Sequence, residues 1–240
     1  MMDTRRLLSF VRRAVDDYHM IAPNDRIAVG VSGGKDSLAL LAGLAALRRF
    51  YPNPFDLIAL TVDMGFPGVD FGAVADFCRE LDVPYHIEKT DIAAVVFDIR
   101  KEENPCSLCA KMRRGVIHGT AKKLGCNKVA LGHHFDDVVD TFMLNLFFEG
   151  RIGCFSPVTY LSRTDITLIR PLIYMPEKDI RYFTKRENLP VLTSPCPADG
   201  HTEREEMKKL LDDLERCHRG LRHRIFRALS AAGVDGFGEG

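Results

Sequence analysis

A glycine turn between a buried strand and an apolar helix limits the folds open to this chain more than any other feature. Residues 26–31 form a short apolar run that predicts a strand, and the loop at residues 32–36 leads into a predicted apolar helix that continues through about Arg49. Between them lies Ser32-Gly33-Gly34, where glycines let the backbone turn tightly and point its N–H groups at an anion. The positive end of the following helix adds to this effect, so the turn predicts an anion-binding site.

The same alternation of strand and helix continues through most of the chain. Further strands are predicted at residues 56–62, 84–88, 128–131 and 166–169, and helices at residues 69–81, 107–124 and 136–148. This pattern predicts an α/β fold, a parallel sheet with helices on both faces. We expect an N-terminal amphipathic helix in residues 1–25, the main domain in 26–200, and a small C-terminal helical appendage in 201–240, helical over residues 203–229.

Composition excludes several classes of protein. Lys plus Arg total 33 and Asp plus Glu total 33, so no overall basic field indicates nucleic-acid binding, and any RNA contact must come from local patches. The first twenty residues lack the apolar core of a signal peptide, and no apolar stretch reaches the roughly 20 residues of a membrane span. We therefore expect a cytoplasmic protein without a membrane partner, whose seven cysteines are free thiols or metal ligands.

The glycine turn belongs to a six-residue motif, SGGKDS, at residues 32–37. It is not a Walker A loop, because Asp36 stands where that motif needs Ser or Thr, and its glycine spacing does not fit a dinucleotide fingerprint. The motif matches the PP-loop signature of the ATP pyrophosphatase superfamily. The resemblance implies that ATP is split between its α and β phosphates, with Asp36 near Mg²⁺ and Lys35 adding a positive charge. The implied pyrophosphate cradle consists of Ser32, Gly33, Gly34 and Ser37. A glycine turn without a ligand is the alternative.

Acidic residues follow the other predicted strands. Asp63 comes just after the second strand, and Asp136 and Asp137 follow the string Leu131-Gly132-His133-His134. Because open α/β sheets bind ligands at the carboxyl ends of their strands, we expect the three acids and Gly132 at the nucleotide site. Asp136 and Asp137 can equally cap the next helix, and the two histidines are more typical of structural residues. The expected catalytic residues are Lys35, Asp36 and Asp137.

Cys106 and Cys109 form a C-x-x-C pair at the start of a predicted helix, whose positive end favours thiolates. Cys196, between two prolines, has a setting that suits a third ligand. Three cysteines on a [4Fe-4S] cluster leave one iron open, whereas a zinc knuckle or a redox dithiol needs no such arrangement and remains an alternative. Cys78 and Cys126 are expected to be small core residues. Cys154 and Cys217 have no assignment.

Several strings in a fixed order make the resemblance more specific. The C-x-x-C pair is followed by Lys111-Met112-Arg113-Arg114-Gly115, then by Leu131-Gly132-His133-His134-Phe135-Asp136-Asp137, and later by Ile169-Arg170-Pro171-Leu172. In this order the strings resemble the TtcA family of tRNA 2-thiocytidine synthetases. The segment around Cys196 departs from the family pattern, because no second cysteine stands beside it.

Membership of that family implies a [4Fe-4S] cluster on Cys106, Cys109 and Cys196. It also implies that ATP, with Mg²⁺, adenylates the C2 oxygen of a pyrimidine in tRNA, which sulfur then replaces. An anticodon-loop cytidine is the expected base, and the sulfur donor is a cysteine desulfurase or free sulfide. A cysteine persulfide route stays open, and a homodimer is the default assembly.

Two basic segments are candidates for RNA contact. Arg113 and Arg114 stand close to the proposed cluster and are the preferred residues, while the C-terminal segment is basic over residues 216–227. Solvated helix faces are the alternative for both. Two further functions remain open: a PP-loop ligase or thiolase acting on another base or small molecule, with a zinc or persulfide site, and a non-catalytic nucleotide or iron-sulfur sensor.

Overall fold

A six-stranded sheet forms the centre of the computed structural model, which describes residues 4–100, 105–193, 196 and 203–238. The strands are β1 (Asp25–Gly30), β2 (Phe55–Asp63), β3 (Tyr85–Lys89), β4 (Lys128–Ala130), β5 (Val158–Leu161) and β6 (Ile166–Ile169). They lie in the order β3-β2-β1-β4-β6-β5, and every neighbouring pair is parallel except β5 with β6. The carboxyl ends of β1, β2 and β4 therefore meet at one edge of the sheet.

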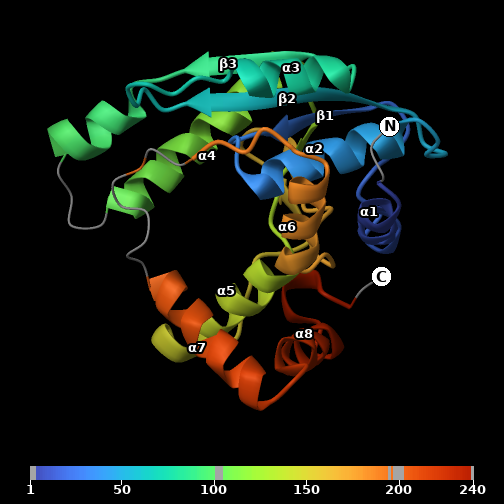
Figure 1. The fold of residues 1–240 in the computed structure, drawn as a ribbon, viewed down its shortest axis with the longest axis vertical. Coiled ribbons are helices and arrows are strands. Elements are labelled where there is room, and N and C mark those ends of the chain that lie inside the picture. Colours follow the sequence, from blue (N-terminus) through green and yellow to red (C-terminus); the bar gives the residue numbers. More distant parts are fainter. Residues whose placement is uncertain (1–3, 101–104, 194–195, 197–202, 239–240) are drawn as a thin grey trace.

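Helices cover both faces of this sheet, which confirms the predicted fold class (Figure 1). The α-helices are α1 (Arg5–Asp17), α2 (Lys35–Arg48), α3 (Gly72–Glu80), α4 (Pro105–Lys123), α5 (Phe135–Phe148), α6 (Glu177–Arg186), α7 (Glu203–Cys217) and α8 (Leu221–Ala231). Short π and 3₁₀ segments, η1 (Ala94–Arg100) and η2 (Val234–Gly236), complete the described elements. α5, α7 and α8 lie together at the end of the molecule opposite β3 (Figure 1).

The alternation of side chains in β1 separates two apolar layers. Ile27 and Val29 belong to the larger core, which also contains the buried residues of α1 and α2. Ala28 points to the other face and packs in the cluster that includes Ala121 of α4. Because β1 is central and buried on both faces, its sequence is a continuous apolar run without polar alternation.

Three elements differ from the sequence-based prediction. β5 was not predicted, since its four residues are only partly buried or exposed, and it adds an antiparallel edge to an otherwise parallel sheet. The helix predicted over residues 203–229 is two helices, because Gly220 adopts a left-handed conformation with φ 79° between α7 and α8. A π-helical segment, η1, follows β3 and was not predicted either.

Within the part of the chain that the structure describes, the longest apolar helices fall short of what crossing a membrane requires.

Candidate active site

Serine hydroxyls fold the loop between β1 and α2 back on itself. The Ser37 Oγ donates to the Gly34 carbonyl over 2.8 Å and accepts from the Ser32 N–H over 3.2 Å. The Ser32 Oγ in turn accepts from the Gly34 N–H over 3.3 Å. These bonds fix the loop at the start of α2, whose unpaired N–H groups favour an anion there.

Two glycines let other segments approach this loop closely. Gly33 has φ +82°, and a Cβ on it would lie 2.7 Å from the Leu192 side chain. The Gly33 carbonyl also accepts from the Leu192 N–H over 2.9 Å, which ties the segment leading to Cys196 onto the loop. A Cβ on Gly132 would lie 3.2 Å from the backbone of Asp36 and Ser37. Both positions therefore favour glycine for reasons of space, and Gly33 also for its conformation.

A cavity of about 510 Å³ opens at the carboxyl ends of β1, β2 and β4. Its polar lining includes the predicted residues Ser32, Gly34, Asp36, Ser37, Asp63, Arg113, Gly132 and Asp137. Its apolar lining includes Leu60, Val62, Met64, Phe66, Val69, Phe71, Ile117, Leu131 and Leu192. An apolar wall with a few convergent polar groups is the usual form of a small-molecule site, and this one is large enough for a nucleotide. Lys35 and Asp136 lie outside its lining.

One carboxylate oxygen in this cavity has no partner. The Asp36 Oδ1 is buried and forms no hydrogen bond within the described residues. The His134 Nε2 lies 3.7 Å from this oxygen. A buried carboxylate oxygen without a donor is costly unless a cation or a proton satisfies it. Asp36 therefore suits the role of a Mg²⁺ ligand, since Mg²⁺ binds carboxylate oxygens beside phosphates.

Lys35 is held by two carboxylates. Its Nζ lies 3.0 Å from the Asp36 Oδ2 and 3.1 Å from the Glu177 Oε1. Burial lowers the pKa of Lys35, but the charges of Asp36 and Glu177 outweigh burial, and the net effect is a raised pKa. The ammonium is consequently charged at neutral pH and fixed at the start of α2.

Glu177, the first residue of α6, is the centre of an ion network that sequence reasoning missed. Besides Lys35, it contacts the Lys208 Nζ at 2.6 Å and the Arg181 guanidinium at 2.8 Å. Burial raises the pKa of Glu177, but these three cations outweigh it and hold the pKa well below the usual 4.5. The network joins the phosphate loop to α7. Only the acidic helix start was visible in the sequence, since Lys208 lies 31 residues away.

Glu177→Gln is expected to lower the free energy of unfolding by about 2 kcal/mol, since it leaves three cations around a neutral group. The value is below that of a fully buried pair because the Lys208 and Arg181 side chains are 35% and 62% exposed. Because the pKa of Glu177 is depressed, its stabilisation is present above the ordinary carboxylate pKa and is lost only as pH falls below it. Urea unfolding at pH 7 and pH 3 measures both effects.

Glu206→Gln is the matched control for this variant, because Glu206 is exposed on α7 and the substitution removes the same charge. It is expected to change the free energy of unfolding by no more than about 0.5 kcal/mol. Equal stability of the two variants at pH 7 would show that the Glu177 network adds nothing.

The two acids at the start of α5 have different surroundings. Asp137 forms a capping box with His134, accepting from the His134 N–H over 3.0 Å, and still lines the cavity. Its other oxygen binds Arg204 of α7 at 3.1 Å. Asp136 accepts from the Glu177 N–H over 2.7 Å and lies 3.7 Å from Arg222 of α8. Asp137 thus caps the helix and faces the nucleotide cavity, whereas Asp136 faces α6 and α8.

His133 lines the cavity as an uncharged, half-buried ring. Burial lowers its pKa to about 4, and the nearby Arg170 contributes in the same direction. Its Nδ1 has no hydrogen-bond partner within the described residues, and its ring lies 4.8 Å from that of Phe155. The neutral ring is therefore available to a ligand as a hydrogen-bonding group and not as a charge.

The candidate cysteines lie beside the nucleotide cavity. The Cys109 Sγ is 3.7 Å from the Sδ of Met64, which lines the cavity. Burial raises the pKa of the Cys109 thiol, and the nearby Cys196 and Cys106 raise it further against the opposing charge of Arg113. The expectation that the helix start favours a thiolate at Cys109 is therefore wrong for the metal-free thiol, because burial and the neighbouring sulfurs dominate.

The thiols of Cys106, Cys109 and Cys196 lie near one another, but they are not packed closely enough for a single metal ion. Among the residues described, no three His, Cys, Asp or Glu side chains are grouped tightly enough to hold one metal ion. A four-iron cluster binds each thiolate to a different iron, so its ligands stand farther apart. Pro195 and Pro197, which flank Cys196, lie outside the described residues.

The other cysteines lie elsewhere in the fold. Cys78 and Cys126 are buried in the core, as predicted. Cys154 is half-buried, and its Sγ donates to the Val138 carbonyl over 3.5 Å. Cys217 is exposed at the end of α7.

The two arginines proposed for RNA contact have different surroundings. Arg113 lines the nucleotide cavity and acts electrostatically on Cys109. Arg114 is exposed, and its Nε donates to the Ala110 carbonyl one turn earlier in α4 over 3.2 Å. Arg113 is therefore the one of the pair that faces the site.

Comparisons with known proteins agree with this geometry. The family model described as "PP-loop domain" matches residues 4–214. The chain is 41% identical to a tRNA-cytidine(32) 2-sulfurtransferase of Geobacter sulfurreducens over 94% of this chain and 89% of the relative. A protein of the same name from Pelobacter propionicus is 42% identical, over 94% and 85% of the two chains. The chain belongs to the PP-loop family, within its TtcA branch.

Two solved structures share the fold of this PP-loop protein. The U34-tRNA thiolase NcsA from Methanococcus maripaludis, solved with its [4Fe-4S] cluster, superposes with a TM-score of 0.78 at 28% identity, over 93% of this chain and 77% of that one. An NH3-dependent NAD synthetase from Campylobacter jejuni superposes with a TM-score of 0.50 at 18% identity, over 95% and 92% of the two chains, and shares the fold alone. The PP-loop family match extends beyond the predicted main domain at both ends, since it includes α1 and most of α7.

Proposed function

We propose that this protein is an ATP-dependent tRNA sulfurtransferase that replaces the C2 oxygen of an anticodon-loop cytidine with sulfur. The contact between the Cys109 Sγ and the Met64 Sδ, 3.7 Å apart, carries the proposal, because Met64 lines the nucleotide cavity and Cys109 is one of the three proposed cluster ligands. Sulfur chemistry and ATP chemistry then share one site. The names of the TtcA relatives and the cluster of the NcsA structure support the same reading.

In the first step the C2 oxygen attacks the α-phosphorus of ATP, and the bond from that phosphorus to the bridging oxygen of pyrophosphate breaks. The loop of Ser32, Gly34 and Ser37 holds the leaving pyrophosphate through its N–H and hydroxyl groups. Lys35 supplies a fixed positive charge at the start of α2, held there by Glu177. Such preorganised charge stabilises the transition state more than the ground state.

Mg²⁺ belongs to the proposal through Asp36, whose unpartnered Oδ1 is the oxygen that would bind it beside the phosphates. When bound, the ion supplies charge neutralisation on phosphate oxygens. The half-buried, neutral His133 and the capping acid Asp137 complete the polar wall of the cavity. We propose that the apolar wall, with Phe66 and Phe71, packs on the adenosine.

In the second step a sulfur nucleophile adds to C2, and AMP leaves with the former C2 oxygen. Because the leaving group is a phosphate monoester and not an oxide, the displacement becomes feasible at neutral pH. We propose that Cys106, Cys109 and Cys196 hold a [4Fe-4S] cluster, which when bound supplies an open iron for inorganic sulfide. With free sulfide as the donor, the net exchange of oxygen for sulfur needs no oxidant or reductant.

The proposal is tested with anaerobically purified protein, tRNA, ATP, Mg²⁺ and sodium sulfide. The expected products are 2-thiocytidine, detected by mass spectrometry of digested tRNA, and one pyrophosphate for each sulfur inserted. Binding of ATP without pyrophosphate release would instead indicate a sensor. Pyrophosphate release without thiolated tRNA would indicate a ligase of another substrate.

A further inference from the structure

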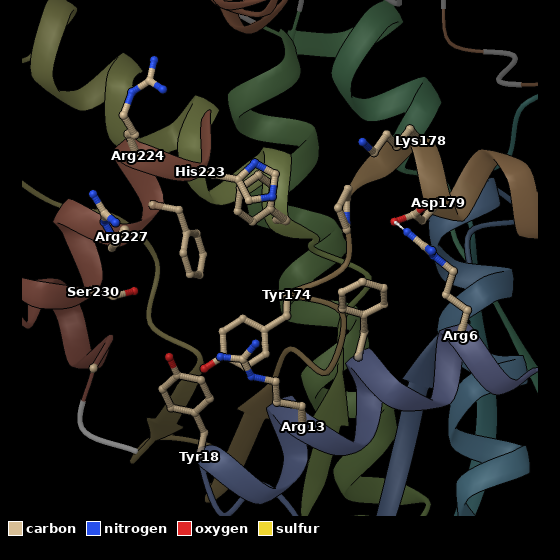
Figure 2. Close-up of a pocket in the computed structure, with 15 residues that line it drawn as sticks. Arg6, Arg13, Tyr18, Tyr174, Lys178, Asp179, His223, Arg224, Arg227 and Ser230 are labelled. Atoms are coloured by element: carbon tan, nitrogen blue, oxygen red, sulfur yellow. Dashed lines mark hydrogen bonds and ion pairs between the residues drawn. The ribbon is translucent and has the colours of Figure 1, made fainter. Parts of the chain in front are cut away.

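A second cavity, of about 620 Å³, lies away from the nucleotide site between α1, the start of α6, and α8 (Figure 2). Its charged lining consists of Arg6, Arg13, Lys178, Arg224 and Arg227, against the single carboxylate of Asp179. Since the whole chain carries no net charge, this concentration of cations is a local feature. A cavity of this charge recognises an anion.

Most of these cations have no acidic partner. Arg6 pairs with Asp179 at 2.9 Å, and Arg13 pairs with Asp17 at 3.4 Å. The side chains of Lys178 and Arg227 form no ion pair or hydrogen bond with any described residue, and the Arg224 guanidinium donates only to backbone carbonyls. All five side chains are exposed. The surface therefore keeps unneutralised charge that an incoming anion can pair with.

Aromatic rings form the floor between these charges. The ring lining consists of Phe10, Tyr18, Phe135, Tyr174, Phe226 and the imidazole of His223. The Arg13 guanidinium lies over the Tyr174 ring, 4.4 Å from its centroid, and the His223 ring lies 4.7 Å from that of Phe135 (Figure 2). Rings and guanidinium planes interleaved with cations are the surface on which nucleic-acid bases stack while their phosphates are bound.

The second cavity and the nucleotide cavity have no lining residue in common among those described, but residues adjacent in the chain line the two. Phe135 lines the basic cavity, while His133 and Asp137 beside it line the nucleotide cavity. In the same way Lys178 lines the basic cavity, and its neighbour Glu177 binds Lys35 of the phosphate loop. The start of α5 therefore contributes side chains to both cavities.

We propose that this cavity is a docking site for an unpaired segment of the substrate tRNA, with phosphates on Lys178 and Arg227 and bases against the aromatic floor. This inference rests on the proposed function. The cations stand on three different helices around the rim and do not converge on one point, which suits a chain of phosphates better than one small anion. Contacts of this kind position a nucleic acid without reading its sequence.

The test compares tRNA binding by the wild type with Lys178→Glu/Arg227→Glu, using fluorescence anisotropy over a range of salt concentrations. The double variant is expected to bind tRNA at least roughly tenfold more weakly. The slope of log affinity against log salt concentration is expected to fall by the equivalent of about two phosphate contacts. Arg49→Glu/Arg163→Glu is the matched control: it reverses the same number of charges, and both residues are exposed and outside the cavity. It is expected to bind tRNA as the wild type does.

ATP-induced thermal stabilisation, measured on each variant, shows that the fold and the nucleotide site are intact and is expected to be unchanged. Equal tRNA affinity of the two double variants would overturn the docking site. A second result would also overturn it: AMP or inorganic phosphate binds through Lys178 and Arg227, but tRNA binding does not depend on these residues. The cavity would then hold a free nucleotide or anion. A wild type that binds tRNA through these residues but forms no thiolated base would support the docking site and refute the proposed thiolation.

Discussion

Cys109→Ser is expected to lower thiolation of cytidine in tRNA by more than about a hundredfold while leaving ATP binding close to that of the wild type. The Cys109 Sγ lies 3.7 Å from Met64, which lines the nucleotide cavity, but Cys109 does not itself line the cavity. Removing a residue that only supports a metal ligand already lowers metal affinity or activity about 10–100-fold. Removing a thiolate ligand itself is expected to lower it further. Mass spectrometry of tRNA nucleosides measures the activity, and iron and sulfide analysis of anaerobic protein measures the cluster.

Cys217→Ser is the control, because Cys217 is also a free thiol but is exposed at the end of α7. It is expected to retain the iron, the sulfide and the activity of the wild type. Full iron content in Cys109→Ser would remove this residue from the proposed ligands. Zinc in place of iron in the wild type would favour the alternative of a zinc site.

The central sheet was predictable because buried parallel strands have a strong local signal. All five predicted strands, including residues 26–31 and 56–62, agree with β1, β2, β3, β4 and β6 within one residue at each end. β5 escaped prediction since an edge strand of four partly buried residues has no apolar run. The break between α7 and α8 depends on one left-handed residue, Gly220, inside a charged helical pattern. One glycine does not outweigh the helical periodicity of the residues around it, so the sequence predicted a single helix there.

The nucleotide cavity was partly predictable because strand ends converge in a parallel sheet. Knowing that Ser32, Asp63 and Gly132 each follow a strand was enough to place them together, and all three line the cavity. The apolar wall that includes Phe66 and Phe71 was not predicted, since loop aromatics carry no pattern that distinguishes a ligand wall from a core. The assigned roles of these residues stay predictions.

Long-range ion pairs were the part that sequence patterns could not supply. Glu177 lies in the first turn of α6, and only the fold shows that it joins Lys35 to Lys208. The C-terminal basic segment likewise divides in the structure. Arg222 is buried, binding Asp140 at 2.6 Å, whereas Arg227 stays exposed at the second cavity. Charge counts along the chain cannot separate these two roles.

Lys35→Met is expected to reduce the rate of pyrophosphate release and thiolation on the order of a thousandfold, as for the loss of one preorganised charge at a transition state. Lys35 carries its charge at the start of α2 and is held there by Glu177 at 3.1 Å. Removing it does not leave Glu177 without cations, because Lys208 and Arg181 remain at 2.6 Å and 2.8 Å. The fold is therefore expected to survive, and the loss is chemical.

Single-turnover pyrophosphate release at saturating ATP and tRNA measures this effect separately from substrate binding. Lys185→Met is the matched control, because Lys185 is exposed on α6 and the change of side chain is the same. Its rate is expected to equal that of the wild type. If Lys35→Met kept more than about a tenth of the wild-type rate, the charge at this position would contribute less than about 1.4 kcal/mol to the transition state, and Lys35 would be a structural partner of Glu177 instead.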